Sequence, residues 1–260
     1  MIRLLIVTLA VNAAVLQASG FDDMILWRYD LPVDSQSVFS LEPSRVCRKG
    51  LQAVFLYSRP YSIEDLGWNT AAAGYGFGRV GYFGRFSSYG YDNYYTRNVY
   101  SGGIACRIAD NLHASAEARY QHEKFLGVGG FGDIKLGFNA SYEAGRLSAV
   151  FGLSDITLKN DCGPRGNPIA RPWAGVSYLM ENEIGFIASI KRTENSRTRW
   201  LFQQQIGISR AVDLYIGILN RPNVLYGSLD ISYRSVTLLL TYYSVGRLDD
   251  TIVLGLGVGS

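Results

Sequence analysis

The sequence has few of the residues on which metal centres and nucleic-acid binding depend. Among 260 residues there are 3 Cys and 2 His, and no pair of cysteines has the C-x-x-C spacing of a metal site. Cys47, Cys106 and Cys162 are odd in number, so at least one stays unpaired or pairs with another chain, and their spacing leaves any disulfide pairing open. The net charge of +3 is too small to predict a nucleic-acid partner. We therefore expect no metal and no cofactor.

Proline, charge and long hydrophobic runs are also scarce. None of the 7 prolines lies between Pro60 and Pro164 or after Pro222, and long Pro-free stretches suit β-ladders, which need every backbone N–H. After residue 51 no apolar run reaches the ~20 residues of a membrane-spanning helix. Only 18% of the residues are charged, against ~25% in soluble domains, while glycine (29) and tyrosine (18) are plentiful. This composition predicts a β-protein that faces something other than plain water.

The first 20 residues have the pattern of a secretory signal. Arg3 precedes an apolar run over residues 4–16, and Ala18-Ser19-Gly20 supplies small residues at a cleavage position. The run is too short to span a bilayer. The sequence therefore predicts an exported chain.

Apolar and polar residues alternate along most of the remaining chain. Between Leu112 and Gln121, Leu, Ala and Tyr alternate with His, Ser, Glu, Arg and Gln, which predicts a strand with one apolar face and one polar face. About fourteen such segments can be placed, each near the ~10 residues of a tilted membrane-spanning strand. The predicted strands cover residues 51–58, 67–78, 79–87, 97–108, 111–122, 131–142, 146–155, 172–180, 183–191, 198–208, 211–219, 223–233, 235–244 and 251–259.

The connections between these segments alternate between short and long. Transmembrane β-barrels show this alternation, because their periplasmic turns are short and their extracellular loops are longer. We therefore predict an all-β fold, an antiparallel transmembrane β-barrel with both ends of the barrel chain on the periplasmic side. The alternative is a soluble β-sandwich or lipocalin-like barrel, in which turn lengths have no reason to alternate. Aromatic residues near strand ends are predicted to form interfacial girdles: Trp68, Tyr89, Tyr91, Tyr94, Tyr95, Trp173, Tyr178, Tyr242 and Tyr243.

The polar face of each strand should line the lumen. The resulting lumen candidates are His113, Glu117, Arg119, Lys135, Lys191, Arg199, Asp213 and Asp230. Opposite charges in a confined lumen predict either ion pairs that brace the barrel or a polar constriction, and because neither sign dominates we expect no strong ion selectivity. His113 is interpreted as a polar lumen residue, since no G-x-S-x-G nucleophile motif is present, and the chain is predicted not to be an enzyme.

One glycine-rich stretch has the spacing of a dinucleotide-binding motif. Residues 127–132 match the G-x-G-x-x-G dinucleotide fingerprint, but strand-like alternation follows them where the fingerprint requires a helix. We interpret the stretch as an extracellular loop.

The layout resembles the FadL-like and PorV-like outer-membrane proteins. The stretch Leu56-Tyr57-Ser58-Arg59-Pro60-Tyr61-Ser62-Ile63-Glu64-Asp65-Leu66 is similar to the first strand and loop of PorV-like chains. Glu42-Pro43-Ser44-Arg45-Val46 keeps the Pro of that group's Asn-Pro-Ala-Gly-Leu turn but lacks its Asn and Gly. The resemblance implies a signal peptide (1–20), a periplasmic plug segment (21–50) with Trp27, Phe39 and Pro43 as plug candidates, and an outer-membrane barrel (51–260). The alternative for the plug segment is a disordered leader.

The resemblance also implies two functions for a chain in the cell outer membrane. A FadL-like barrel would pass small hydrophobic molecules, whereas a PorV-like barrel would be a non-enzymatic scaffold or shuttle for secreted proteins. The expected partners are outer-membrane lipid and either small hydrophobic ligands or secreted proteins. The resemblance specifies neither the cargo nor the oligomeric state.

Overall fold

The computed structural model describes residues 46–47, 50–60, 63, 65–91, 94–160, 170–181, 183–192, 198–220, 223–244 and 250–259. The predicted signal segment, the plug candidates Trp27, Phe39 and Pro43, and Cys162 lie outside these ranges. Within the described ranges, no helix is both long and apolar enough to span a membrane.

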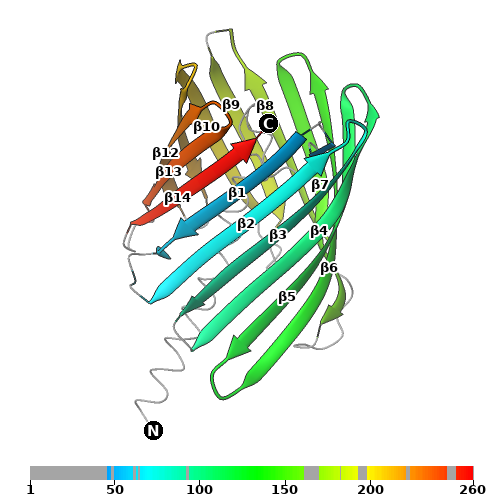
Figure 1. Cartoon of the computed structure of the whole chain (residues 1–260), viewed down its shortest axis with the longest axis vertical. Coiled ribbons are helices and arrows are strands. Elements are labelled where there is room, and N and C mark those ends of the chain that lie inside the picture. Colours follow the sequence, from blue (N-terminus) through cyan, green and yellow to red (C-terminus); the bar gives the residue numbers. More distant parts are fainter. Residues whose placement is uncertain are drawn as a thin grey trace.

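The described chain forms a closed barrel of fourteen antiparallel strands, each paired with its sequence neighbours (Figure 1). The predicted fold class is confirmed. The strands are β1 (Gly50–Ser58), β2 (Leu66–Gly76), β3 (Val80–Tyr91), β4 (Tyr95–Ala109), β5 (Leu112–Phe125), β6 (Gly129–Ala144), β7 (Leu147–Asn160), β8 (Arg171–Leu179), β9 (Ile184–Arg192), β10 (Thr198–Ser209), β11 (Val212–Leu219), β12 (Val224–Tyr233), β13 (Val236–Ser244) and β14 (Thr251–Gly259).

The first and last strands close the barrel. β1 pairs with β14 in a continuous antiparallel register from Gln52 opposite Gly259 to Ser58 opposite Val253. The Ser58 hydroxyl also donates a hydrogen bond of 2.7 Å to the Ile252 carbonyl oxygen. Closure removes the unpaired edges that an open sheet would expose.

The two ends of the barrel differ in their connections. The end that holds the start of β1 and the finish of β14, here called the turn end, has connections of two to four residues. The opposite end, the loop end, has connections of three to ten residues. Figure 1 shows the β5–β6 hairpin reaching beyond the β3–β4 hairpin at the loop end.

Two predicted loops are much shorter than expected, so the strict alternation of loop lengths was wrong there. Strands β3 to β6 continue into the predicted loops 88–96 and 123–130, leaving only residues 92–94 and 126–128 as connections. Backbone hydrogen bonds close both turns, from Tyr94 N to Tyr91 O (2.9 Å) and from Val128 N to Phe125 O (3.2 Å). Gly127 has a φ of 76°, a conformation that glycine adopts without steric cost, so the glycine-rich stretch forms a tight hairpin.

The outside of the barrel is apolar on every strand. Along β13 the exposed fractions alternate, with Leu238 at 54% and Leu240 at 47% exposed, while Leu239 between them is 3% exposed. A soluble protein does not expose so continuous an apolar surface, whereas a lipid-facing barrel requires it.

The predicted aromatic girdle is only partly correct. Tyr91, Tyr94, Tyr178 and Tyr242 are exposed on the outside as a girdle requires. Five of the predicted girdle residues are instead buried inside the barrel: Trp68, Tyr89, Tyr95, Trp173 and Tyr243. The period of two explains the error, because neighbours such as Tyr242 and Tyr243 point to opposite faces of the sheet.

The residues just before β1 lie inside the barrel. The Gly78 N–H, in the β2–β3 turn, donates a hydrogen bond of 3.1 Å to the carbonyl oxygen of Cys47, which is fully buried. A Cβ on Gly81 would collide with the backbone of Val46, so this glycine allows the close approach. No disulfide joins Cys47 to Cys106 within the described residues.

Candidate functional site

The lumen has two unlike walls. One, here called the apolar wall, is a continuous cluster of buried side chains from β1 to β4 and from β9 to β14. It consists of Val54, Leu56, Leu66, Trp68, Tyr89, Tyr95, Ile187, Leu201, Tyr215, Leu219, Val224, Tyr226, Leu239, Tyr243 and Val253. The sequence had predicted that small, polar and charged residues would line the lumen throughout, and this cluster shows that the prediction was wrong at these positions. Polar side chains such as Thr70, Gln203 and Thr241 are buried on the same strands, as predicted.

The apolar wall starts at the loop end. Leu66, Tyr95 and Val224 are the first residues of β2, β4 and β12, and Leu219 is the last residue of β11, so all four lie next to loop-end connections. Apolar side chains therefore extend to that end of the barrel, where they are buried against one another.

One buried hydrogen bond stiffens the apolar wall. The Tyr226 hydroxyl donates to Gln203 Oε1 over 2.6 Å, between β12 and β10. The Tyr226 ring crosses β11 over Gly217, where a Cβ would collide with it. On the other side of β12, the Tyr243 ring of β13 packs against the Tyr226 ring, with 5.5 Å between the two ring centroids. This hydrogen bond satisfies the Tyr226 hydroxyl and Gln203 Oε1, while Gln203 Nε2 has no hydrogen-bond partner among the described residues.

The opposite wall, here called the charged wall, is built by β4 to β9. It consists of Arg97, Glu117, Arg119, Glu123, Asp133, Lys135, Asp155, Arg171 and Lys191. Arg119 lies between two carboxylates, with its Nη2 3.5 Å from Glu117 Oε1 and its Nη1 3.6 Å from Asp155 Oδ1. Arg171 Nη1 lies 3.2 Å from Asp155 Oδ2 on the other side.

A second polar network lies further toward the loop end. Arg97 Nη2 donates to Gln121 Oε1 (3.0 Å), and Gln121 Nε2 donates to Glu123 Oε1 (2.7 Å). Arg97 Nε is also 3.6 Å from Glu123 Oε1. The three side chains tie β4 to β5 through charge-assisted hydrogen bonds.

A β-bulge places Asp155 in the lumen. The register between β6 and β7 shifts between Leu136 and Phe138, and Asp155 has a φ of 59°. In a regular strand Ser154 would face the lumen and Asp155 the lipid, whereas both line the same lumen cavity here. Bulges are used to re-aim single side chains in this way.

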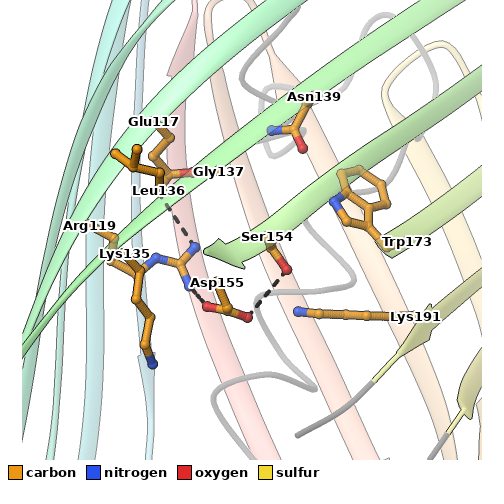
Figure 2. A pocket seen from close by; sticks show the side chains of 10 residues that line it. All are labelled: Glu117, Arg119, Lys135, Leu136, Gly137, Asn139, Ser154, Asp155, Trp173 and Lys191. Atoms are coloured by element: carbon orange, nitrogen blue, oxygen red, sulfur yellow. Dashed lines mark hydrogen bonds and ion pairs between the residues drawn. The ribbon is translucent and has the colours of Figure 1, made fainter. Parts of the chain in front are cut away.

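The charged wall borders a cavity that is open to the lumen (Figure 2), with ≈ 560 Å³ of empty space when the adjoining open solvent is included. One row of paired residues crosses the strands β6 to β9 at this cavity. Asn139 is paired with Gly152, Gly152 with Trp173, and Trp173 with Lys191. Figure 2 shows Lys191 extending toward Asp155 and the Trp173 ring standing beside it. Among the described residues, no group of three or more His, Cys, Asp or Glu could hold a metal ion.

The lumen candidates taken from the sequence fall into two sets. Glu117, Arg119, Lys135 and Lys191 come together around this cavity. The others lie elsewhere on inward-facing positions. His113 is buried toward the turn end of β5, Arg199 is opposite Lys191 in the register, and Asp213 is opposite Asp230.

Sequence reasoning missed three residues of the site. Asp155 was missed because the bulge reverses its phase, Arg171 because it was placed in a loop, and Trp173 because it was placed in the girdle. A usable signal was present for Asp155, since regular alternation would have put its carboxylate in lipid, where ionisable residues are costly.

Similarity to known proteins is confined to solved structures. No family model and no curated protein matches the sequence. The chain is similar to the CymD monoaromatic hydrocarbon channel, with a TM-score of 0.61 and 11% identity over 88% of this chain and 93% of that one. It is also similar to the Acinetobacter baumannii outer membrane protein Omp33, with a TM-score of 0.55 and 11% identity over 82% of this chain and 98% of that one. A Pseudomonas aeruginosa FadL homologue has a TM-score of 0.51 and 9% identity over 84% of this chain and 92% of that one. At these identities the likeness shows a shared fold, that of closed antiparallel outer-membrane barrels.

Proposed function

We propose that this chain is an outer-membrane channel that passes small, largely hydrophobic molecules through its lumen. The observation that carries the proposal is the apolar wall, which starts at the loop end and continues inside the barrel. A water-filled porin has a polar interior, so buried leucine, valine and tyrosine side chains in the lumen favour a less polar solute. The CymD monoaromatic hydrocarbon channel, which shares the fold, supports the same solute class.

The location follows from the outer surface. Every strand exposes at least one large apolar side chain, and most expose several at alternate positions, which matches a bilayer as surrounding solvent. The predicted signal segment would bring the chain to the outer membrane. The predicted plug is retained as part of the proposal, and the contacts of Val46 and Cys47 inside the barrel support it.

Uptake in intact cells tests the proposal. A bacterial host that expresses the chain should accumulate the neutral hydrophobic fluorophore N-phenyl-1-naphthylamine faster than the same host with an empty vector. Leu239→Gln, which makes the apolar wall polar, should reduce the rate. Thr237→Gln is the matched control, because Thr237 also faces inward on β13 but lies outside the apolar wall. Equal rates in the expressing and empty-vector cells would refute the proposal.

A PorV-like scaffold is the second candidate, and the stretch from Leu56 to Leu66 favours it. This stretch forms the end of β1, the first loop-end connection and the start of β2. A scaffold would retain exported proteins in a pull-down from the outer membrane and would leave fluorophore uptake unchanged by Leu239→Gln.

A further inference from the structure

We propose that the cavity bounded by Lys135, Trp173 and Lys191 binds a small organic anion, a carboxylate attached to a flat apolar group. The inference rests on the proposed function, because it names a class of solute for the same lumen. The charged wall supplies the anion site and the apolar wall supplies the path to it.

The acidic residues of the cavity already have basic partners. Arg119 contacts both Glu117 (3.5 Å) and Asp155 (3.6 Å), and Arg171 contacts Asp155 (3.2 Å). Two carboxylates are thus matched by two guanidinium groups. Any further basic group in the cavity gives it an excess of positive charge.

Two lysines supply that excess. Among the described residues the Lys191 ammonium makes neither a hydrogen bond nor an ion pair, although the side chain extends into the cavity (Figure 2). The Lys135 ammonium has one ionic contact, 3.8 Å to Asp133 Oδ2, which is too long for a hydrogen bond. A confined ammonium group without a close partner is stabilised by a bound anion.

Two neutral polar groups lie beside the lysines. Within the described part of the chain, neither the Trp173 indole N–H nor the Asn139 amide makes a hydrogen bond, and both groups line the cavity. A Cβ on Gly152 would touch Trp173 Nε1 and Asn139 Oδ1 together, so the two side chains converge above that glycine. The two ammonium groups and the indole N–H are donors suited to an oxyanion, whereas the Asn139 oxygen at this point can accept a hydrogen bond from the protonated edge of a ligand.

The remaining features favour a carboxylate with an apolar body over a compact inorganic anion. The Trp173 side chain is mostly buried, and the part that lines the cavity is apolar surface that an aromatic ring can contact. A solute that reaches the cavity from the loop end also passes the apolar wall. A strongly hydrated anion such as phosphate would lose part of its hydration there, which costs free energy.

Calorimetric titration of the full-length protein in detergent micelles tests the inference, with benzoate as the probe. We expect saturable binding of benzoate, and binding at least about tenfold weaker for its neutral analogue benzyl alcohol and its cationic analogue benzylamine. Lys191→Met should weaken benzoate binding at least about tenfold. Lys124→Met is the matched control, because Lys124 is exposed on β5 outside the cavity, and it should leave the affinity unchanged.

Equal affinity for benzyl alcohol, unchanged affinity in Lys191→Met, or no benzoate binding by the wild-type protein would overturn the inference. The heat-induced gel shift of a folded barrel, measured on each variant, separates lost binding from lost folding. If Lys191→Met does not fold, Lys135→Met provides the same test. Failure of the proposed channel function would show separately, as absent fluorophore uptake by a protein that still binds benzoate.

Discussion

Asp155 and Arg171 form a buried ion pair across β7 and β8, with 3.2 Å between Asp155 Oδ2 and Arg171 Nη1. The pair exists because a bulge turns Asp155 away from the lipid-facing side, at a positive φ that Asp tolerates better than most residues. The backbone conformation and the electrostatics of the charged wall therefore depend on the same residue.

Asp155→Asn should destabilise the barrel. Asn accepts the same φ, so the substitution removes the charge while it keeps the bulge, and Arg119 and Arg171 lose their shared carboxylate. We expect the free energy of unfolding to fall by about 3 kcal/mol, measured by urea titration in lipid vesicles. Asp110→Asn is the control: the Asp110 side chain is 99% exposed in its pair with Arg107, and exposed pairs contribute about 0–1 kcal/mol. Equal losses in the two variants would contradict this account.

Tyr226→Phe should weaken the apolar wall without changing its shape. The substitution removes one hydroxyl and leaves Gln203 Oε1 without its 2.6 Å donor. An unmatched buried acceptor costs about 1–3 kcal/mol, which the same urea titration measures. Tyr233→Phe, at an exposed tyrosine on the same strand, should cost much less. A Tyr226→Phe variant as stable as the wild type would show that water replaces the hydroxyl.

Gly217→Ala should be destabilising, which is the reverse of the usual effect of Ala in a strand. The added Cβ would collide with the Tyr226 ring, and such overpacking costs about 1–3 kcal/mol. Gly227→Ala on the neighbouring strand is the matched control, because the nearest atom to its Cβ would be 4.0 Å away. Urea titration gives the unfolding midpoint of each variant. A midpoint for Gly217→Ala above that of Gly227→Ala would refute the close approach of the Tyr226 ring to Gly217.

Leu240→Arg should impair insertion into lipid. Leu240 is 47% exposed on the outer face of β13, and arginine near the middle of a bilayer costs about 2–4 kcal/mol. Tyr233→Arg, at the strand end next to the β12–β13 turn, should cost only about 0–1 kcal/mol because that position is close to the interface. Folding yields in vesicles measure both effects, and equal yields would argue against a lipid-facing position for Leu240.

The alternation of apolar and polar residues, which has a period of two, was sufficient to predict the strands and most side-chain directions. Glu117, Arg119 and Lys135 could be placed in the lumen because each alternates with apolar neighbours along its strand. The phase of Asp155 could not be predicted, because a bulge changes the count by one without changing the composition. Aromatic residues at strand ends were ambiguous for another reason. Trp173 and Tyr178 suit either face chemically, and only the register shows that the first points inward.

The ion pairs between residues of different strands also could not be predicted from the sequence. Arg119 and Asp155 lie on strands separated by β6, so their contact depends on the register of two ladders together with the bulge. The apolar wall was missed because its members, such as Leu201 and Val253, look like interruptions of an otherwise polar face when each strand is considered alone.

The seam between β1 and β14 sets the order in which the barrel can be completed. Ser58 and Ile252 are 194 residues apart in the chain, yet the Ser58 hydroxyl donates to the Ile252 carbonyl oxygen beside the ladder that closes the barrel. Until the last strand arrives, β1 and β13 both present unpaired backbone groups, which lipid does not satisfy and which another chain in water could pair with. A chain that stops before residue 251 has the other thirteen strands and still cannot close this barrel. The nine residues of β14 therefore complete the ladders on both sides of the seam, to β1 and to β13.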